Sequence, residues 1–279
     1  MGRWLAWLER ALNKPKQSFD RARAMGVLAL VLLLLVVALL SFGVHLLLGN
    51  WVLEAVFASS LLACRSLWQH VQAIATPLQA GDVPAAREAL SHIVGRDTTA
   101  LDETAISRAA LESLSESLSD GVVAPAFWGL IFGLPGMAVY KAINTADSMI
   151  GHKDERYLAF GWAAARLDDA ANFIPARITA LLIVLASGGA LLRSSKTLRS
   201  DARKHASPNA GWPEAAMAGA LGVQLGGPVS YDGIEHAHAW LGQGGDDANA
   251  ADVARGLRLY ARACGLFALL LAGLWALLA

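Results

Sequence analysis

The sequence predicts an all-α, polytopic integral membrane protein, with amphipathic or soluble helices and one broken apolar segment of the re-entrant or kinked type. Hydrophobic residues make up 55% of the 279 residues and charged residues 16%, and the mean hydropathy is +0.43. These values lie far from the averages of soluble proteins. Strand-like alternation of Val, Ile and Thr is almost absent, whereas the helix formers Ala and Leu abound.

The first membrane span is the clearest element. No charged residue occurs between Arg23 and Glu54, and Leu28 to Leu40 is almost entirely Leu, Val and Ala. Such a run can cross about 30 Å of hydrocarbon, so we expect a membrane anchor at residues 25–48. A signal peptide is the alternative, but its apolar region is shorter and ends in a small-residue cleavage site. Basic residues precede the span and predict a cytoplasmic N-terminus: Arg3, Arg10, Lys14, Lys16, Arg21 and Arg23.

Four later apolar stretches are weaker or shorter, so we expect about three to five spans in all. They are Trp51 to Ile74, Val122 to Tyr140, Ile178 to Leu192, and a C-terminal span at residues 263–279. The second of them is interrupted by Pro125, Gly133, Pro135 and Gly136, which is typical of a re-entrant or kinked element. Basic residues after Leu192 predict that this part is cytoplasmic, which requires an even number of crossings from the N-terminus.

A soluble helical section is expected at residues 76–121. Gly81 to His92 reads as a short polar helix, and Leu101 to Ser119 as an amphipathic one. On the second helix Glu112 and Glu116 are stacked at i, i+4. An ordinary solvated face explains such a stripe as well as a functional site does.

Charge, cysteines and missing motifs exclude several classes of protein. Basic and acidic residues both total 23, so there is no net positive charge to hold nucleic acid. Cys64 and Cys264 are far apart in apolar sequence, and we expect neither a structural disulfide nor a thiolate metal site. The motifs GxxxxGK[ST], HExxH and GxSxG are absent, as is GxGxxG after a strand.

Polar clusters beside apolar segments mark a motif-bearing core at residues 95–228, because burying such groups without a function is costly. The first cluster starts with Gly95, Arg96, Asp97 and Thr98, where we expect one helix to end and the next to be capped. Its acidic stripe continues to Asp120.

The second cluster covers residues 140–151. Lys141 is suited to holding a phosphate and Asp147 to binding a hard cation. Asn144, Thr145 and Ser148 can bond to phosphate or amide groups. Local capping and turn chemistry would explain the same residue types.

The third cluster contains two adjacent carboxylates, Asp168 and Asp169. They repel each other, which is easiest to explain if Mg²⁺ neutralises at least one of them. Consecutive helical side chains diverge by about 100°, however, so both need not reach one ion. Arg166 and Arg177 can bind phosphate or carboxylate through bidentate bonds, or serve as interfacial anchors and ion-pair partners. Pro175 is expected in the first turn of the next apolar helix.

The fourth cluster is a polar loop at residues 205–214, which we expect to present a ligand surface. Its polar side chains include His205, Ser207, Asn209 and Glu214. His205 is either an ordinary loop histidine or an acid–base group near neutral pH. The small residues that follow let backbones approach a helix or a ligand.

Five motifs in order closely resemble the CobD/CbiB family, the adenosylcobinamide-phosphate synthases. They are GRDT (95–98), SDGVVAP (119–125), YKAINTADSMIG (140–151), ARLDDAANFIPAR (165–177) and SPNAGWPEAAMAGALGVQLGGP (207–228). The resemblance implies one membrane-embedded domain over residues 1–279. It also implies a bacterial inner-membrane ligase that uses ATP and Mg²⁺ to join aminopropanol phosphate, or a related amino alcohol, to a propionate carboxylate of adenosylcobyric acid.

The roles that we assign on this basis are hypotheses. Catalysis is expected from Asp147, Asp168, Asp169, Glu116 and Asp120, of which Asp147, Asp168 and Asp169 hold Mg²⁺. Arg96, Lys141, Arg166 and Arg177 are expected to bind phosphates. Other substrate contacts are expected from Asp97, Thr98, Asn144, Thr145, Ser148, Asn172, His205, Ser207, Asn209 and Glu214.

Two departures from the family pattern stand out. Members usually carry a further apolar segment and Asp-Pro and His-Pro motifs before the equivalent of Met1. Where the family commonly has Glu-Asn before Ser-Asp-Gly, this chain has Glu116-Ser117-Leu118. The leading alternative function is a non-catalytic, AmpE-like signalling or scaffold protein. A transporter is a third alternative, although no inverted repeat is apparent.

Overall fold

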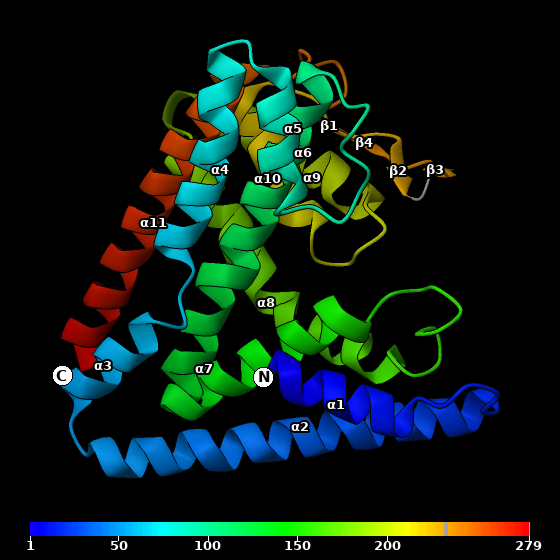
Figure 1. Cartoon of the computed structure of the whole chain (residues 1–279). Coiled ribbons are helices and arrows are strands. Elements are labelled where there is room, and N and C mark those ends of the chain that lie inside the picture. Colours follow the sequence, from blue (N-terminus) through cyan, green and yellow to red (C-terminus); the bar gives the residue numbers. More distant parts are fainter. Residues whose placement is uncertain (232–233, 279) are drawn as a thin grey trace. The chain divides into compact units, whose positions relative to one another are not determined.

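The computed structural model describes residues 1–231 and 234–278. Helices dominate, as predicted (Figure 1). The chain forms two compact units: unit 1 contains residues 1–62 and 124–173, and unit 2 contains residues 63–123 and 174–279. The single domain that we expected therefore contains two compact units.

The strongest span prediction corresponds to one long helix of unit 1. Helix α2 (Phe19–Leu48) has 30 residues and begins after Ser18, whose hydroxyl accepts a hydrogen bond from the Arg21 amide. At 1.5 Å per residue its length is about 45 Å, more than the hydrocarbon core requires. Helix α1 (Gly2–Leu12) lies beside it in Figure 1, and Leu8 packs into the same buried cluster as Leu33.

Unit 1 also contains α3 (Trp51–Ser59) and α7 (Ala124–Ile150). Helix α7 is interrupted at Gly133, whose φ of 65° and ψ of −157° are not helical. Glycine tolerates this conformation because it has no Cβ, and Pro135 then lies in the first turn after the kink, where its missing N–H costs little. The predicted break in the second apolar stretch is confirmed.

Helix α8 (Trp162–Ala186) leads from unit 1 into unit 2 and corrects one expectation. We expected a new helix to open at Pro175, but Pro175 lies inside α8. An interior proline deprives the carbonyl four residues earlier, that of Ala171, of its helical donor. The indole Nε1–H of Trp128 donates to this carbonyl at 3.1 Å and satisfies it. A side chain far away in the sequence therefore replaces the backbone donor that the proline removes from the helix.

Unit 2 contains most of the remaining helices. These are α4 (Cys64–Gln79), α5 (Val83–Ser91), α6 (Glu103–Leu118), the π-helix η1 (Ser119–Val123), η2 (Gly188–Ala190), α9 (Leu191–Asp201), η3 (Ala202–Lys204), α10 (Gly211–Leu221) and α11 (Ala250–Leu278). Helix α10 is buried along almost its whole length, and its Ala and Gly residues allow close packing. Both cysteines are free.

Two details of unit 2 differ from the sequence-based expectation. The Gly95–Thr98 motif is neither a helix end nor a cap, because α5 ends at Ser91 and α6 is capped by Asp102, whose carboxylate accepts from the Ala105 amide. The motif lies in the connecting loop. An aspartate four residues further along is an equally good cap, and the sequence alone does not rank the two.

The second difference is the presence of four very short strands. Strand β1 (Leu225–Gly226) pairs antiparallel with β4 (Trp240–Leu241), and β2 (Val229–Tyr231) pairs antiparallel with β3 (Ile234–His236). Two- and three-residue strands are too short to show alternation, so the sequence did not reveal them. The all-α class is unaffected.

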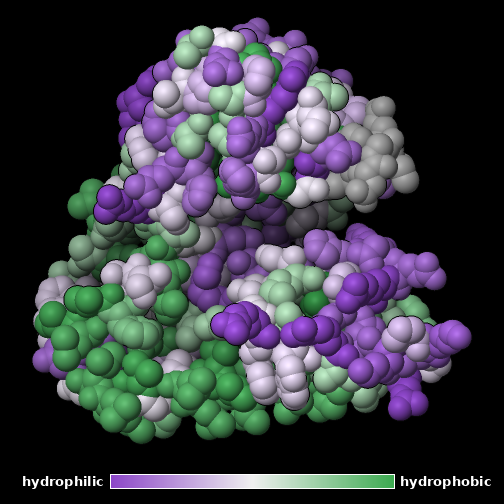
Figure 2. All heavy atoms as spheres, in the orientation of Figure 1, coloured by the Kyte–Doolittle hydropathy of each residue, from purple (hydrophilic) through white to green (hydrophobic). Residues whose placement is uncertain are grey.

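In the part of the chain that the structure describes, five helical stretches are long and apolar enough to cross a membrane: Phe19–Leu48, Trp51–Gln79, Glu103–Ile150, Trp162–Ala186 and Ala250–Leu277. Trp51–Gln79 contains two helices, α3 and α4, that a turn separates. On the face in Figure 2, hydrophobic side chains cover the part of unit 1 around α2 and α3. Exposed apolar surface of this extent is typical of a protein that contacts lipid.

Candidate functional site

The predicted site residues form two groups, one in each unit. Unit 1 holds Lys141, Asn144, Thr145, Asp147, Ser148, Arg166, Asp168, Asp169 and Asn172. Unit 2 holds Arg96, Asp97, Thr98, Glu116, Asp120, Arg177, His205, Ser207, Asn209 and Glu214. Each group has its own network of contacts.

In unit 1 a hydrogen-bonded chain, which we call the α7–α8 polar cluster, centres on Asp168. Asn172 donates through Nδ2 to Asp168 Oδ2 at 3.0 Å, and Asn144 donates through Nδ2 to Asp168 Oδ1 at 3.4 Å. The Tyr140 hydroxyl donates to Asn172 Oδ1 at 2.8 Å. Tyr140, Asp168 and Asn172 are all buried. Asp168 is therefore a buried carboxylate whose two oxygens each accept from an amide.

Helical spacing explains how the sequence builds this cluster. Asp168 and Asn172 are four residues apart on α8, and Tyr140 and Asn144 are four apart on α7, so each pair lies on one helix face. Asp147 follows Asn144 by three residues on the same side. We did not single out Tyr140 from the sequence, although its i, i+4 relation to Asn144 was a usable signal.

The three aspartates occupy different environments. Asp147 and Asp169 both act electrostatically on Asp168, so the carboxylates lie near one another. Asp169 is more exposed and forms an ion pair with Arg166, with 3.7 Å between Asp169 Oδ2 and Arg166 Nη1. This agrees with the divergence of consecutive helical side chains.

Two of the three aspartates, Asp147 and Asp168, are suited to binding a hard cation together. Among residues 1–231 and 234–278, no group of three or more His, Cys, Asp or Glu side chains could hold a metal ion. Mg²⁺ is usually bound by one or two protein carboxylates together with substrate phosphates, and Asp147 with Asp168 fits that requirement. The assignment of Mg²⁺ to all three aspartates stays a prediction.

The hydroxyls of the second cluster make local bonds. Thr145 Oγ1 donates to the Lys141 carbonyl at 2.7 Å, and Ser148 Oγ donates to the Asn144 carbonyl at 2.9 Å. The segment is helical rather than a turn. Both hydroxyl protons are donated to carbonyls of the helix. Each hydroxyl would have to rotate away from its carbonyl before it could donate to a phosphate.

In unit 2 a second group, the Glu214 cluster, contains Arg96, Glu112, His205 and Glu214. Glu214 is 4% exposed. Burial, together with the negative charges of Glu112 and Glu116, raises the pKa of the Glu214 carboxyl well above its usual range. Its Oε1 lies 3.8 Å from His205 Nε2.

His205 is held in one orientation by the loop that it begins. Its Nδ1 accepts a hydrogen bond from the Ser207 amide at 2.9 Å, so the neutral ring carries its proton on Nε2, towards Glu214. Burial lowers the pKa of the His205 imidazole below its usual value. The neutral imidazole therefore presents its Nε2–H, a hydrogen-bond donor, to the side of the ring on which the Glu214 carboxyl lies.

Glu112 corrects the interpretation of the acidic stripe as a solvated face. Glu112 is 6% exposed, and it forms an ion pair with Arg96. Its Oε1 also accepts from the Gly226 amide at 2.7 Å. The carboxylate therefore ties the Gly95–Thr98 loop and the Gly226 turn to α6. Because Arg96 already pairs with Glu112, a phosphate would have to share or replace that partner.

Arg177 positions the predicted ligand loop. Its Nη1 donates to Asn209 Oδ1 at 3.2 Å and its Nη2 to the Pro208 carbonyl at 3.4 Å. The guanidinium lies 4.4 Å from the centroid of the Trp212 ring. Within the loop, Ser207 Oγ accepts from the amides of Asn209 and Ala210, both at 3.2 Å. The expected loop at residues 205–214 is non-helical only at residues 205–210, which Arg177 braces, because α10 begins at Gly211 and places Glu214 in its first turn.

The remaining predicted residues differ in their exposure to solvent. Glu116 and Asp97 are exposed, and Thr98 is buried. Asp120 is half-buried in the π-helix η1, an element that occurs frequently at functional sites. Beside it, the Ser119 hydroxyl is buried without a hydrogen-bond partner, which sequence reasoning did not foresee.

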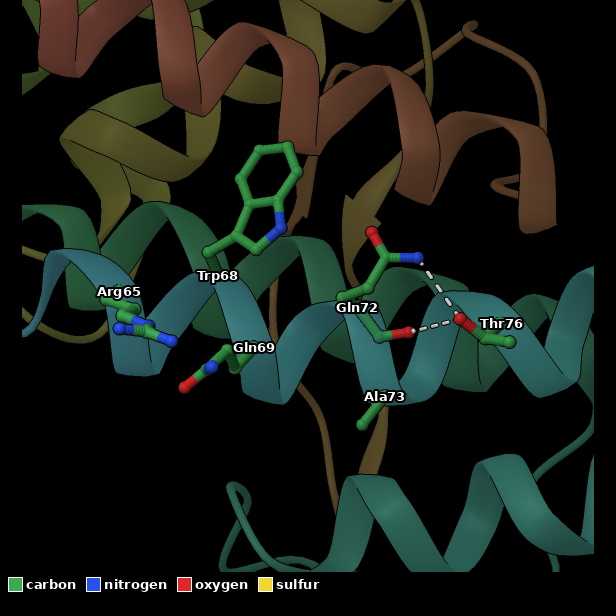
Figure 3. A pocket seen from close by; sticks show the side chains of 6 residues that line it. All are labelled: Arg65, Trp68, Gln69, Gln72, Ala73 and Thr76. Atoms are coloured by element: carbon green, nitrogen blue, oxygen red, sulfur yellow. Dashed lines mark hydrogen bonds between the residues drawn. The ribbon is translucent and has the colours of Figure 1, made fainter.

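A separate cavity of about 480 Å³ lies along α4 and contains none of the predicted site residues. Figure 3 shows its lining: Arg65, Trp68, Gln69, Gln72, Ala73 and Thr76. Gln72 Nε2 donates to Thr76 Oγ1 at 3.1 Å, and that hydroxyl donates to the Gln72 carbonyl at 2.9 Å. Gln72 and Thr76 are thus engaged with each other.

Comparisons with known proteins agree with the resemblance in the motifs. The family model described as CobD/Cbib protein matches residues 1–260. A Rhodobacter capsulatus protein named "Cobalamin biosynthesis protein CobD" is 49% identical over 265 residues, which cover 93% of this chain and 84% of that protein. A Sinorhizobium protein of the same name is 44% identical over 281 residues, covering 96% and 86%. No solved structure matches the chain significantly.

Proposed function

The chain belongs to the CobD/CbiB family of cobalamin biosynthesis, and from this premise we propose that it is an amide-forming ligase. It joins aminopropanol phosphate, or a related amino alcohol, to a propionate carboxylate of adenosylcobyric acid and gives adenosylcobinamide phosphate. The observation that carries the proposal furthest is the buried Asp168 carboxylate next to Asp147. Asp168 is buried and Asp147 half-buried, and a buried carboxylate with a second carboxylate beside it is costly unless a cation compensates the charge.

The chemistry requires that a carboxylate be activated. A propionate oxygen of the corrinoid attacks the γ-phosphorus of ATP, the bond to the bridging oxygen breaks, and ADP leaves. The amine nitrogen then attacks the acyl carbon, inorganic phosphate leaves, and the nitrogen loses a proton. When bound, Mg²⁺ supplies neutralisation of the phosphate charge.

The residues of the chain support these steps in different ways. Asn144 and Asn172 fix both oxygens of Asp168, so the carboxylate is oriented before a cation arrives. Lys141, half-buried on the same helix as Asn144, is a cation for phosphate oxygens.

We propose that the protein resides in the bacterial inner membrane with its N-terminus in the cytoplasm. The basic residues around α1 and the start of α2 support this orientation. ATP is available on that side.

The direct test is a reconstituted reaction. The full chain, purified in detergent, is incubated with adenosylcobyric acid, aminopropanol phosphate, ATP and Mg²⁺, and the condensed corrinoid is detected by mass. We expect Asp168→Asn to lower the rate about 100-fold, whereas Asp169→Asn, the same change one residue along, lowers it less than about tenfold. Circular dichroism and gel filtration check that each variant folds.

Two results would count against this assignment. An undiminished rate in Asp168→Asn removes that residue from the metal site while leaving the ligase activity in place. A wild-type chain that forms no product with any amino alcohol or nucleotide favours the AmpE-like scaffold.

A further inference from the structure

Four arginines line one cavity in unit 2. The cavity has a volume of about 390 Å³, and its charged side chains are Arg193, Arg255, Arg258 and Arg262, with no carboxylate among the lining residues. Arg193 lies in the first turn of α9. The other three follow one another at i, i+3 and i+7 on α11, so they share a helix face. None of the four belongs to the proposed catalytic groups.

Two of these arginines have a structural task. Arg193 donates through Nε to the Gly219 carbonyl at 2.7 Å and through Nη2 to the Ala220 carbonyl at 3.0 Å. Arg255 donates through Nη2 to the Leu221 carbonyl at 2.8 Å. These carbonyls belong to the last turn of α10, the negative end of its dipole. Capping α10 therefore explains the presence of Arg193 and Arg255.

Capping of α10 does not explain the other two arginines, Arg258 and Arg262. Within the described residues, neither Arg258 nor Arg262 forms a hydrogen bond or an ion pair. Asp252, on the same helix, is already paired with Arg255, with 2.6 Å between Asp252 Oδ1 and Arg255 Nη1. The cavity thus gathers several like charges, and the exposed guanidinium groups of Arg258 and Arg262 keep their donors available for an anion.

The position of these arginines on α11 indicates which kind of anion they bind. Arg262 is the last charged residue of the chain, and the helix continues as an uninterrupted apolar run. The arginine face of α11 therefore lies where a membrane-crossing segment would leave the hydrocarbon, the level of lipid headgroups. A guanidinium presents a planar pair of donors that matches two oxygens of a phosphate.

We propose that this cavity binds a phosphate group through Arg258 and Arg262, with Arg193 and Arg255 as pre-oriented supporting charges. Either the headgroup of an anionic phospholipid or a soluble phosphate compound carries the same chemistry. The site is independent of the proposed ligase activity, because its test measures binding and not turnover.

The experiment compares two phosphate sources on the full chain. In detergent, inorganic phosphate is titrated against chloride at equal ionic strength, and thermal unfolding is followed by the fluorescence of the nine tryptophans. In nanodiscs, phosphatidylglycerol is compared with phosphatidylcholine in the same way. The variants are Arg258→Gln/Arg262→Gln and, as a matched control, Arg199→Gln, which removes an exposed arginine of α9 outside the cavity.

We expect phosphate, phosphatidylglycerol or both to raise the unfolding temperature of the wild type and of the Arg199→Gln control. The double variant should bind about 100-fold more weakly, about tenfold for each guanidinium lost. A response to phosphatidylglycerol alone identifies the lipid source, and a response to inorganic phosphate alone identifies the soluble one. If the double variant does not fold, Arg258→Lys/Arg262→Lys replaces it and should bind several-fold more weakly.

Two outcomes overturn the proposal. One is a wild type that responds to neither probe. The other is a folded double variant, or lysine variant, whose response equals that of the wild type.

Discussion

Replacing Asn172 with leucine tests the hydrogen-bonded chain between α7 and α8. Asn172 accepts from the Tyr140 hydroxyl and donates to the Asp168 carboxylate. Tyr140 and Asn172 are 1% and 2% exposed, so water cannot replace either bond. Leucine has the same branched skeleton as asparagine, with two methyl groups in place of the amide oxygen and nitrogen, and the substitution therefore removes the amide without opening a cavity.

The expected cost follows from the two bonds. A hydrogen bond to a charged acceptor contributes about 1.5–3 kcal/mol, and a neutral side-chain bond between membrane helices about 0.6–1.7 kcal/mol. We therefore expect Asn172→Leu to lower the free energy of unfolding by about 2–4 kcal/mol. Tyr140→Phe should cost about 1 kcal/mol, and the double variant should cost about 1 kcal/mol less than the sum, because the two residues share one bond.

Equilibrium unfolding by SDS in mixed micelles, followed by circular dichroism, measures all three variants on one scale. Ala163→Val, a substitution on α8 away from the cluster, is the reference for an unrelated helix change. The reasoning is refuted if Asn172→Leu costs less than about 0.5 kcal/mol, or if the coupling energy is below the additivity error of about 0.3 kcal/mol.

Three substitutions test unit 2, and one chelation experiment tests the cation. Glu112→Gln should lower the free energy of unfolding by about 3–5 kcal/mol, since it leaves a partly buried Arg96 unpaired; Glu116→Gln, on the exposed face, should stay within about 0.5 kcal/mol in the same thermal melts. The raised pKa of Glu214 favours its protonated form, so its contribution to stability is complete below the usual glutamate pKa of about 4.3 and is lost as pH rises through the raised value. Melting temperatures from pH 4 to 9 should therefore fall less steeply in Glu214→Gln, and parallel curves would contradict this. Gly227→Ala should cost at least about 1 kcal/mol, because φ is +78° and the new Cβ would lie 2.5 Å from the Trp240 ring; an unchanged melting temperature would contradict it. Removing divalent ions with a chelator should abolish product formation and Mg²⁺ should restore it, whereas activity that survives chelation would contradict the metal assignment.

Much of the fold could be predicted because its signals are local. The charge-free run that became α2 and the glycine and prolines that break α7 act through hydrophobicity and backbone conformation alone. Pro175 was misassigned for the opposite reason. It remains inside α8 because Trp128, 47 positions away in the sequence, satisfies the carbonyl of Ala171 that the proline leaves without a donor.

The candidate sites also combine features that local sequence sets with features that long-range contacts set. The sequence by itself identified candidate residues for the chemistry, since carboxylates, amides and guanidinium groups beside apolar segments are costly to bury and stand out in the motifs. Only the tertiary structure decided their partners: Glu112 clamps the Gly226 amide, Asn172 links Tyr140 to Asp168, and Arg193 meets the arginines of α11 in one cavity. Helical periodicity specifies the face on which a side chain lies, but the group across from it is set by the packing of elements far apart in the chain, and no local pattern records that packing.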